Sequence, residues 1–461
     1  MENEIKDLIN LLKSKRFDEI LRQEKEIVDK FPNDPVLFDI LGLANTFLQN
    51  NENAIRNFKK ALEINPNFFQ SLNNLGNLMF DLKRFDDALD NYKRALTNSS
   101  KNKEIYNNIA NVYSEIGQID DAIKNFKKAI EIDSSFFQAY NGLGNAQKKM
   151  GLFAEAISSY QKSIDINPSY HLAHNNLGVA YYQIGRVDES LKSYNNVLKI
   201  NPSYAPVYWN IHGCSSDITE AKNLLNKCIG LDQNFLKAKY CLSFIKAYEG
   251  DYSDYNYLLD SKDKDDPYLR SFKWIFSLPN KPNLFFSRWL FFDFIIGISN
   301  KSRPFYEFGV WTGLSFKYFL NYFEKGFGFD TFTGLPESWY NEPKGFYTNS
   351  NKIPKINGAN FIKGEFKETL PKFFSTSREK ASIINYDADL YSSTICALEN
   401  SKKVIDENTI LIFDEFIIND TWEEDEFRAL NEFSQNNSYI YEVIAISLFT
   451  KQVAVRLKRD K

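Results

Sequence analysis

The chain has 461 residues, of which 43% are hydrophobic and 25% charged, and its formal net charge is −4. Length and composition predict two or three globular domains, and the lack of a basic excess argues against nucleic acid as a main partner. Four cysteines without a CxxC pair predict neither a disulfide framework nor a zinc site, and they fit a reducing, cytoplasmic compartment. We expect no secretory signal and no transmembrane segment, because the start is acidic and the most apolar stretch, 284–298, is short and carries charges.

The first half of the chain repeats with a period of 34 residues. Three positions recur in each period: a small residue, a second small residue and an aromatic ring. The first position holds Gly42, Gly76, Ala110, Gly144 and Gly178, and the second holds Ala54, Ala88, Ala122, Ala156 and Ser190. The aromatic position holds Phe58, Tyr92, Phe126, Tyr160 and Tyr194. Small residues let paired helices approach, and the ring fills the space between them. The pattern resembles the tetratricopeptide repeat, a stacked helical hairpin. It predicts an α-helical solenoid over 1–250, with strong units over 35–203 and degenerate units over 204–268.

The first helix of each predicted unit is rich in asparagine. Two rows of side chains recur with the repeat, and we expect them on the concave face: Asn73, Asn107, Asn141 and Asn175, and Asn77, Asn111 and Asn145. The rows resemble the asparagine ladders of O-GlcNAc transferase, which grip extended peptide backbone. An amide can both donate and accept, so it pairs with any peptide unit. The resemblance implies a protein or peptide partner, while the alternative is that asparagine is simply common throughout this chain.

A polar tract over 251–282 marks the predicted domain boundary, and the pattern then changes. From 283 to 461, short apolar runs alternate with helical segments, which indicates a mostly parallel sheet with helices on both faces. The predicted strands are 305–309, 326–330, 360–364, 381–387, 409–414, 439–446 and 451–457. Only four residues separate the last two, so they should form an antiparallel hairpin. Seven strands ending in a hairpin resemble the Rossmann-like class I methyltransferase fold, which binds S-adenosylmethionine.

A glycine turn follows the first of these strands. The segment from Glu307 to Ser315 contains Gly309, Val310 and Gly313, and its glycines allow close backbone approach to a ligand. The acid at the end of the second strand, Asp330, suits ribose hydroxyls. These six residues form the predicted cofactor site, although a structural turn explains the glycines equally well when they are taken alone.

Four motifs in order make the resemblance more specific. They are Asp330-Thr-Phe-Thr-Gly-Leu-Pro-Glu337, Lys363-Gly-Glu-Phe-Lys-Glu-Thr-Leu-Pro371, Asp387-Ala-Asp-Leu-Tyr-Ser-Ser-Thr394 and Ile412-Phe-Asp-Glu-Phe416. Together they look like the macrocin O-methyltransferase family, whose members methylate sugar hydroxyls. The match covers roughly 300–457 and not the repeats.

Two acidic clusters follow neighbouring predicted strands, so we expect them on one rim of the sheet. Crowded carboxylates repel unless cations or protons intervene. The family resemblance implies that Asp387, Asp414 and Glu415 bind Mg²⁺ and that Asp389 is the general base. Some members have Asp-Asp where this chain has Asp414-Glu415. All three histidines precede the predicted enzyme domain, which favours Asp389 as the base unless the repeats fold over the site.

The sequence therefore predicts an S-adenosylmethionine- and Mg²⁺-dependent O-methyltransferase acting on a sugar or glycan hydroxyl, with repeats that recruit an acceptor or partner. Two alternatives remain: a scaffold whose methyltransferase-like domain is inactive, and a protein methyltransferase. A long loop after Asp330 carries Tyr340, Phe346 and Tyr347, and a lid and a plain surface loop explain it equally well. The sequence leaves the oligomeric state open.

Overall fold

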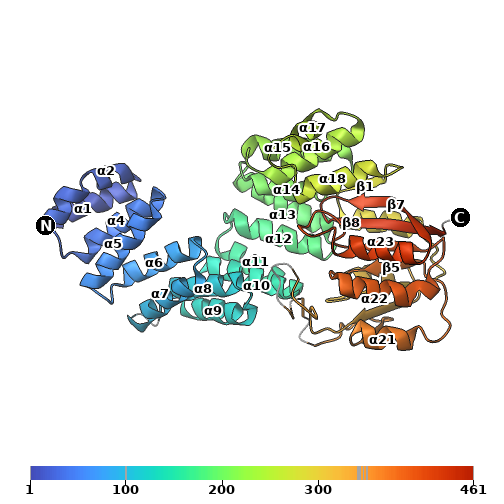
Figure 1. Ribbon diagram of the computed structural model, residues 1–461. Helices are drawn as coiled ribbons and strands as arrows, with labels where there is room; N and C mark the ends of the chain where they lie inside the picture. Colours follow the sequence, from blue (N-terminus) through green and yellow to red (C-terminus); the bar gives the residue numbers. More distant parts are fainter. Residues whose placement is uncertain (1, 99–100, 340–343, 346, 349–350, 460–461) are drawn as a thin grey trace. The chain divides into compact units, whose positions relative to one another are not determined.

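The computed structural model describes residues 2–98, 101–339, 344–345, 347–348 and 351–459 (Figure 1). The chain divides into two compact units, Met1–Ala173 and His174–Lys461. Among the described residues, no helix is long and apolar enough to cross a membrane.

The first unit consists of helices throughout its described length. They are α1 (Glu2–Lys13), α2 (Phe17–Arg22), α3 (Glu24–Lys30), α4 (Pro35–Phe47), α5 (Asn51–Ile64), α6 (Phe69–Asp81), α7 (Phe85–Asn98), α8 (Lys103–Glu115), α9 (Ile119–Ile132), α10 (Phe137–Lys149) and α11 (Phe153–Ile166). Pairs such as α4 with α5 and α6 with α7 form the predicted hairpins.

The repeated small residues sit directly under the repeated rings, as the sequence predicts. A Cβ added to Gly42 would lie 2.5 Å from the Phe58 ring, and one added to Gly144 would lie 2.6 Å from the Tyr160 ring. Both rings are fully buried. Glycine is therefore required at these positions for close packing between the helices, and the 34-residue period is a packing period.

The second unit begins within α12 (His171–Gln183) and continues as helices before the sheet starts. These helices are α13 (Val187–Ile200), α14 (Ala205–His212), α15 (Ile218–Leu231), α16 (Leu236–Glu249), α17 (Ser253–Leu259) and α18 (Pro267–Ser277). The segment 251–282, which the sequence predicts as a boundary, contains α17 and α18. Phe272 of α18 is fully buried in the same apolar cluster as Tyr386 and Phe413 of the sheet.

The sheet has eight strands where the sequence predicts seven. Its strands are β1 (Asn283–Phe285), β2 (Phe305–Phe308), β3 (Gly326–Asp330), β4 (Asn360–Lys363), β5 (Ile383–Tyr386), β6 (Ile410–Phe413), β7 (Tyr439–Ser447) and β8 (Gln452–Arg459). Their order is β1-β7-β8-β6-β5-β2-β3-β4. Strand β8 is antiparallel to β6 and β7, as the predicted hairpin requires, and the remaining pairs are parallel. The additional strand is β1, which pairs with β7.

Helices cover both faces of this sheet, and alternate strand residues point to each face. Tyr306 and Tyr386 belong to the cluster that contains the buried residues of α21 (Phe366–Phe373), α22 (Tyr391–Ser401) and α23 (Glu426–Asn436). Phe305 and Ile383 belong to the cluster of α19 (Arg288–Gly297) and α20 (Leu314–Leu320). This alternation of period two is what a strand buried on both faces requires.

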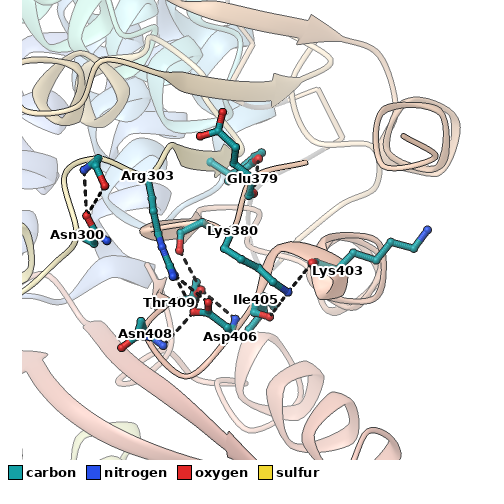
Figure 2. Close-up of polar contacts among 12 residues, drawn as sticks. Asn300, Arg303, Glu379, Lys380, Lys403, Ile405, Asp406, Asn408 and Thr409 are labelled. Atoms are coloured by element: carbon teal, nitrogen blue, oxygen red, sulfur yellow. Dashed lines mark hydrogen bonds and ion pairs between the residues drawn. The ribbon is translucent and has the colours of Figure 1, made fainter. Parts of the chain in front are cut away.

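A polar cluster holds the starting ends of the central strands (Figure 2). Arg303 Nη1 donates to both carboxylate oxygens of Asp406 at 2.9 Å. Thr409 Oγ1 donates to Asp406 Oδ1 at 3.1 Å and also lies 3.0 Å from Ala381 O. Lys380 Nζ donates to Lys403 O at 2.9 Å. These contacts tie together the segments that lead into β2, β5 and β6, so the opposite ends of the same strands are fixed in register.

Candidate functional site

The candidate site lies where β2, β5 and β6 end. Phe308 pairs with Tyr386, and Tyr386 pairs with Phe413, so the three strands finish level. The next residues along this rim are Gly309, Asp387 and Asp414, which confirms that both acidic clusters share one rim. Strand β2 lies between β3 and β5, so the chain order reverses at this point. Open α/β sheets bind ligands at such a switch point, outside the carboxyl ends of the strands.

The turn after β2 passes very close to the acidic rim. Gly309 has φ +90°, and a Cβ added to it would lie 1.7 Å from Asp387 O. Gly313, at φ +77°, ends the turn as the cap of α20. Only glycine fits the first position, because a side chain would collide with the backbone of the neighbouring strand. The sequence predicts that the backbone at these glycines lies close to a ligand. At Gly309 the backbone instead lies close to the backbone of Asp387.

Two acids of the predicted cofactor site have internal partners. Glu307 is fully buried, accepts a hydrogen bond from Ser315 Oγ at 2.8 Å, and has its pKa raised to about 8 by burial. Asp330 Oδ2 accepts from the backbone N–H groups of Val310 and Trp311, both at 2.7 Å. Both carboxyl groups therefore shape the glycine turn, and a role of Asp330 toward a ribose stays a prediction.

Cationic side chains, which the sequence did not reveal as partners, neutralise the second acidic cluster. Arg288 Nη2 donates to both oxygens of Asp414 at 3.1 Å, and Gln452 Nε2 donates to Oδ1 of the same carboxylate. Lys451 Nζ donates to Glu415 Oε2 at 2.7 Å. Arg288 precedes Asp414 by 126 residues, so no local pattern could have paired them. Lys451 lies in the β7–β8 turn, whose position depends on the whole sheet.

Carboxyl groups remain in excess of cations at the rim after this pairing. Asp387 and Asp389 carry carboxyl groups whose pKa is raised well above the usual value, first by burial and then by neighbouring carboxylates. Glu426 of α23 is a further buried acid beside them, with its pKa raised for the same reasons. Five acids thus face two cations, and a divalent cation suits the chemistry of this oxygen-rich donor set. Among the described residues, however, no three acidic, histidine or cysteine side chains are arranged as a metal-ligating group.

Asp389, the predicted general base, occupies an uncommon backbone conformation. Its φ is +58°, the left-handed region, which a residue other than glycine adopts at a cost. Such strain concentrates at functional sites because the surrounding structure has to impose it. His212 of α14 belongs to the second unit, together with the sheet. Its ring, however, lies among Trp209, Phe286 and Phe449, and burial lowers its pKa to about 4. A base role for His212 therefore has no support.

A cavity of about 180 Å³ adjoins the acidic rim. Its walls come from the end of α12, the start of α19, the end of β6 and the β7–β8 turn, and they include Gln183, Trp289, Glu415 and Lys451. A helix of the repeat region therefore lines a cavity beside the predicted metal ligand Glu415. The sequence predicts the repeats as a separate domain, so no local pattern points to this shared wall.

Within the described part of the loop after Asp330, Tyr347 lies near the glycine turn. The ring of Tyr347 lies 5.4 Å from that of Trp311 in an edge-to-face arrangement. Tyr340 and Phe346 lie outside the described residues. A lid function of this loop stays a prediction.

The two asparagine rows make hydrogen bonds within the repeats. Asn77 Oδ1 accepts from Tyr92 OH at 2.7 Å, and Asn145 Oδ1 accepts from Tyr160 OH at 2.7 Å. Asn108 Nδ2 donates to Asn73 Oδ1 at 3.2 Å, which links neighbouring units. In the second unit, Asn175 Oδ1 accepts from Asn210 Nδ2 at 2.8 Å. Asn141 is buried, and Asn107 and Asn111 are half-buried. Several rungs of the ladder thus stabilise the array, and peptide binding by the rows stays a prediction.

Comparisons with known proteins identify the repeats. Residues 42–83, 76–117 and 110–151 match a family described as TPR repeat, and 137–170 and 171–204 match one described as tetratricopeptide repeat. A search of curated proteins found no match. Similar solved structures include MamA, with 28% identity, a TM-score of 0.33, and coverage of 36% of this chain and 97% of that chain. A tetratricopeptide repeat protein from Parabacteroides merdae has 17% identity, a TM-score of 0.46, and coverage of 53% of this chain and 98% of that chain. The helices over 42–204 are therefore tetratricopeptide repeats.

Proposed function

We propose that the second unit is an S-adenosylmethionine-dependent O-methyltransferase, and that the repeats recruit its acceptor or a partner protein. The observation that carries this proposal is the rim at the switch point, where the glycine turn after β2 meets the acids after β5 and β6. The four ordered motifs that resemble the macrocin O-methyltransferase family all lie in this unit. They favour a sugar or glycan hydroxyl as the acceptor.

In this proposal the cofactor supplies an electrophilic methyl group beside the glycine turn. Glu307 and Ser315 hold the turn, and Gly309 lets it lie against the acidic rim. A hydroxyl is a poor nucleophile at neutral pH, so a base has to take its proton as the oxygen attacks. Asp389 suits this step because it follows β5 on the same rim as the glycine turn, at a strained backbone position with φ +58°. Holding the hydroxyl in line with the methyl group supplies much of the acceleration.

Mg²⁺ is proposed at Asp387, Asp414 and Glu415, where it would stabilise negative charge that develops on the acceptor oxygen. The excess of carboxyl groups over cations at the rim supports such an ion. In the structure, Arg288 is hydrogen-bonded to Asp414 and Lys451 to Glu415, so both cations would compete with the ion for these carboxylates. Without a metal, Arg288 and Lys451 neutralise only Asp414 and Glu415 among the five acids.

Methyl transfer to a panel of glycan acceptors tests the proposal, with mass spectrometry detecting the added methyl group. We expect turnover with the purified full chain, and its loss on treatment with EDTA or in Asp387→Ala. The exposed acid Asp420, changed to asparagine, is the matched control and should leave turnover unchanged. Full turnover after complete removal of metal would refute the magnesium role while leaving the methyltransferase standing.

The second candidate function is a protein-interaction scaffold with an inactive sheet unit. The family matches favour it, because they fall on the repeats alone. Titration calorimetry with S-adenosylmethionine separates the two functions, since a scaffold should bind none. A protein methyltransferase, with the repeats holding the substrate peptide, is the third candidate, and methylation of a protein rather than a glycan would identify it.

A further inference from the structure

The cavity beside Glu415 has one wall made by the end of a repeat helix. Its volume of about 180 Å³ equals roughly six water molecules at about 30 Å³ each, so it fits one small ring or a short polyol. Gln183, the last residue of α12, and Glu415, the second residue after β6, both line it. A ligand in this cavity would therefore contact the repeats and the acidic rim together.

Two hydrogen bonds fix the repeat-derived wall to the start of α19. The backbone N–H of Arg288 donates to the hydroxyl oxygen of Tyr182 at 3.1 Å. The indole Nε1 of Trp289 donates to the carbonyl oxygen of Tyr182 at 2.8 Å. Gly185 lies directly over the indole, since a Cβ added there would be 3.4 Å from its ring. The end of α12 is therefore held in place before any ligand arrives, which lowers the cost of binding.

The charges around the cavity are matched in pairs. Arg288 pairs with Asp414, and Lys451 pairs with Glu415. A charged group on an organic ligand would have to break one of these pairs, whereas a neutral ligand leaves both in place, so the lining favours an uncharged ligand. The rings of Trp289 and Phe449 supply apolar surface for its carbon skeleton.

Gln183 supplies hydrogen-bonding capacity to this lining. Its side chain is exposed, and no hydrogen bond of its amide is found within the described residues. An amide can donate to one hydroxyl and accept from another. Gln183 therefore suits a neutral ligand that carries several hydroxyl groups.

We propose that Gln183, a residue of the repeats, contacts the acceptor in this cavity and determines which acceptor is methylated. The inference rests on the proposed methyltransferase function and assigns part of the acceptor site to α12. The repeats would then select the substrate directly, in addition to recruiting partner proteins.

Binding of simple neutral methyl glycosides to the full chain tests this inference, with glucuronic acid and glucosamine as charged comparisons. We expect neutral probes to bind better than charged ones, and Gln183→Ala to weaken their binding about 3- to 10-fold, the loss expected for one hydrogen bond. Gln183→Glu should shift the preference toward glucosamine. Gln70→Ala, an exposed glutamine on α6, is the matched control and should bind like the unaltered chain.

The affinity for S-adenosylmethionine is measured on the same variants to separate the two proposals. Unchanged cofactor affinity with weakened glycoside binding in Gln183→Ala supports the inference. Equal glycoside binding by Gln183→Ala and the unaltered chain overturns it, as does the absence of glycoside binding or a preference for a charged probe. Glycoside binding that depends on Gln183 in a chain that binds no S-adenosylmethionine would support the contact and refute the methyltransferase.

Discussion

Gly309 has the least room of any glycine at the candidate site. A Cβ there would lie 1.7 Å from Asp387 O, and the residue has φ +90°. We predict that Gly309→Ala lowers the free energy of unfolding of the second unit by at least about 3 kcal/mol, because the glycine turn or β5 has to shift. Chemical denaturation measures the change.

The matched control for this substitution is Gly230, an exposed residue of α15 with open space around its Cα. Gly230→Ala should stabilise the same unit by about 0.5–1 kcal/mol, through helix propensity alone. Equal effects of the two substitutions would mean that Gly309 is not packed against Asp387.

The buried carboxyl group of Glu307 predicts a pH dependence of stability. Burial raises its pKa from 4.5 to about 8 in the folded chain. Below pH 4.5 the carboxyl group is protonated in both the folded and the unfolded state, so its ionisation does not lower the free energy of unfolding. Between pH 4.5 and about 8 only the unfolded state ionises freely, so the folded state loses stability as the pH rises.

Glu307→Gln removes this titration. The melting temperature of Glu307→Gln should therefore exceed that of the unaltered chain by more at pH 8 than at pH 5. The corresponding difference in free energy of unfolding can change by up to about 1.4 kcal/mol per pH unit. An advantage that is the same at both pH values would show that Glu307 ionises normally in the folded chain.

At the scale of elements, the ion pair between Arg288 and Asp414 connects the start of α19 to the end of β6. Their side chains are 26% and 10% exposed, so removing one partner leaves a poorly hydrated charge. We predict that Arg288→Met costs about 3–5 kcal/mol of stability, and that adding Asp414→Asn recovers part of it. Lys325→Met breaks an exposed pair with Glu379 and should change stability by less than about 1 kcal/mol. Additive effects of the two changes at Arg288 and Asp414 would contradict the coupling.

The sequence predicted elements well where a local pattern specifies them. The repeat helices follow from the glycine–aromatic period, and seven strands follow from apolar runs bounded by turns. It missed β1, because three residues carry no alternation, and this strand exists only through its pairing with β7. It also treated 251–282 as a linker, although α18 buries Phe272 in the core. The cations that pair with the acids escaped prediction because tertiary folding alone brings them there.

At the scale of the whole molecule, the division into two compact units predicts that a ligand of the sheet unit stabilises only one of them. S-adenosylmethionine at one hundred times its dissociation constant should raise the stability of His174–Lys461 by about 2.7 kcal/mol. Differential scanning calorimetry should then show one transition moving and the transition of Met1–Ala173 unchanged. A shift of both transitions would contradict independent unfolding, and a shift of neither would contradict cofactor binding.

The polar cluster around Asp406 has a consequence for which parts of the sequence can vary. Because Arg303, Thr409 and Lys380 hold the starting ends of the strands, the alignment of the strands does not rest on contacts at the opposite rim alone. Under the proposed function, substitutions among the rim acids, such as aspartate for Glu415, would alter cation preference or acceptor choice while the starting ends of the strands stay tied together.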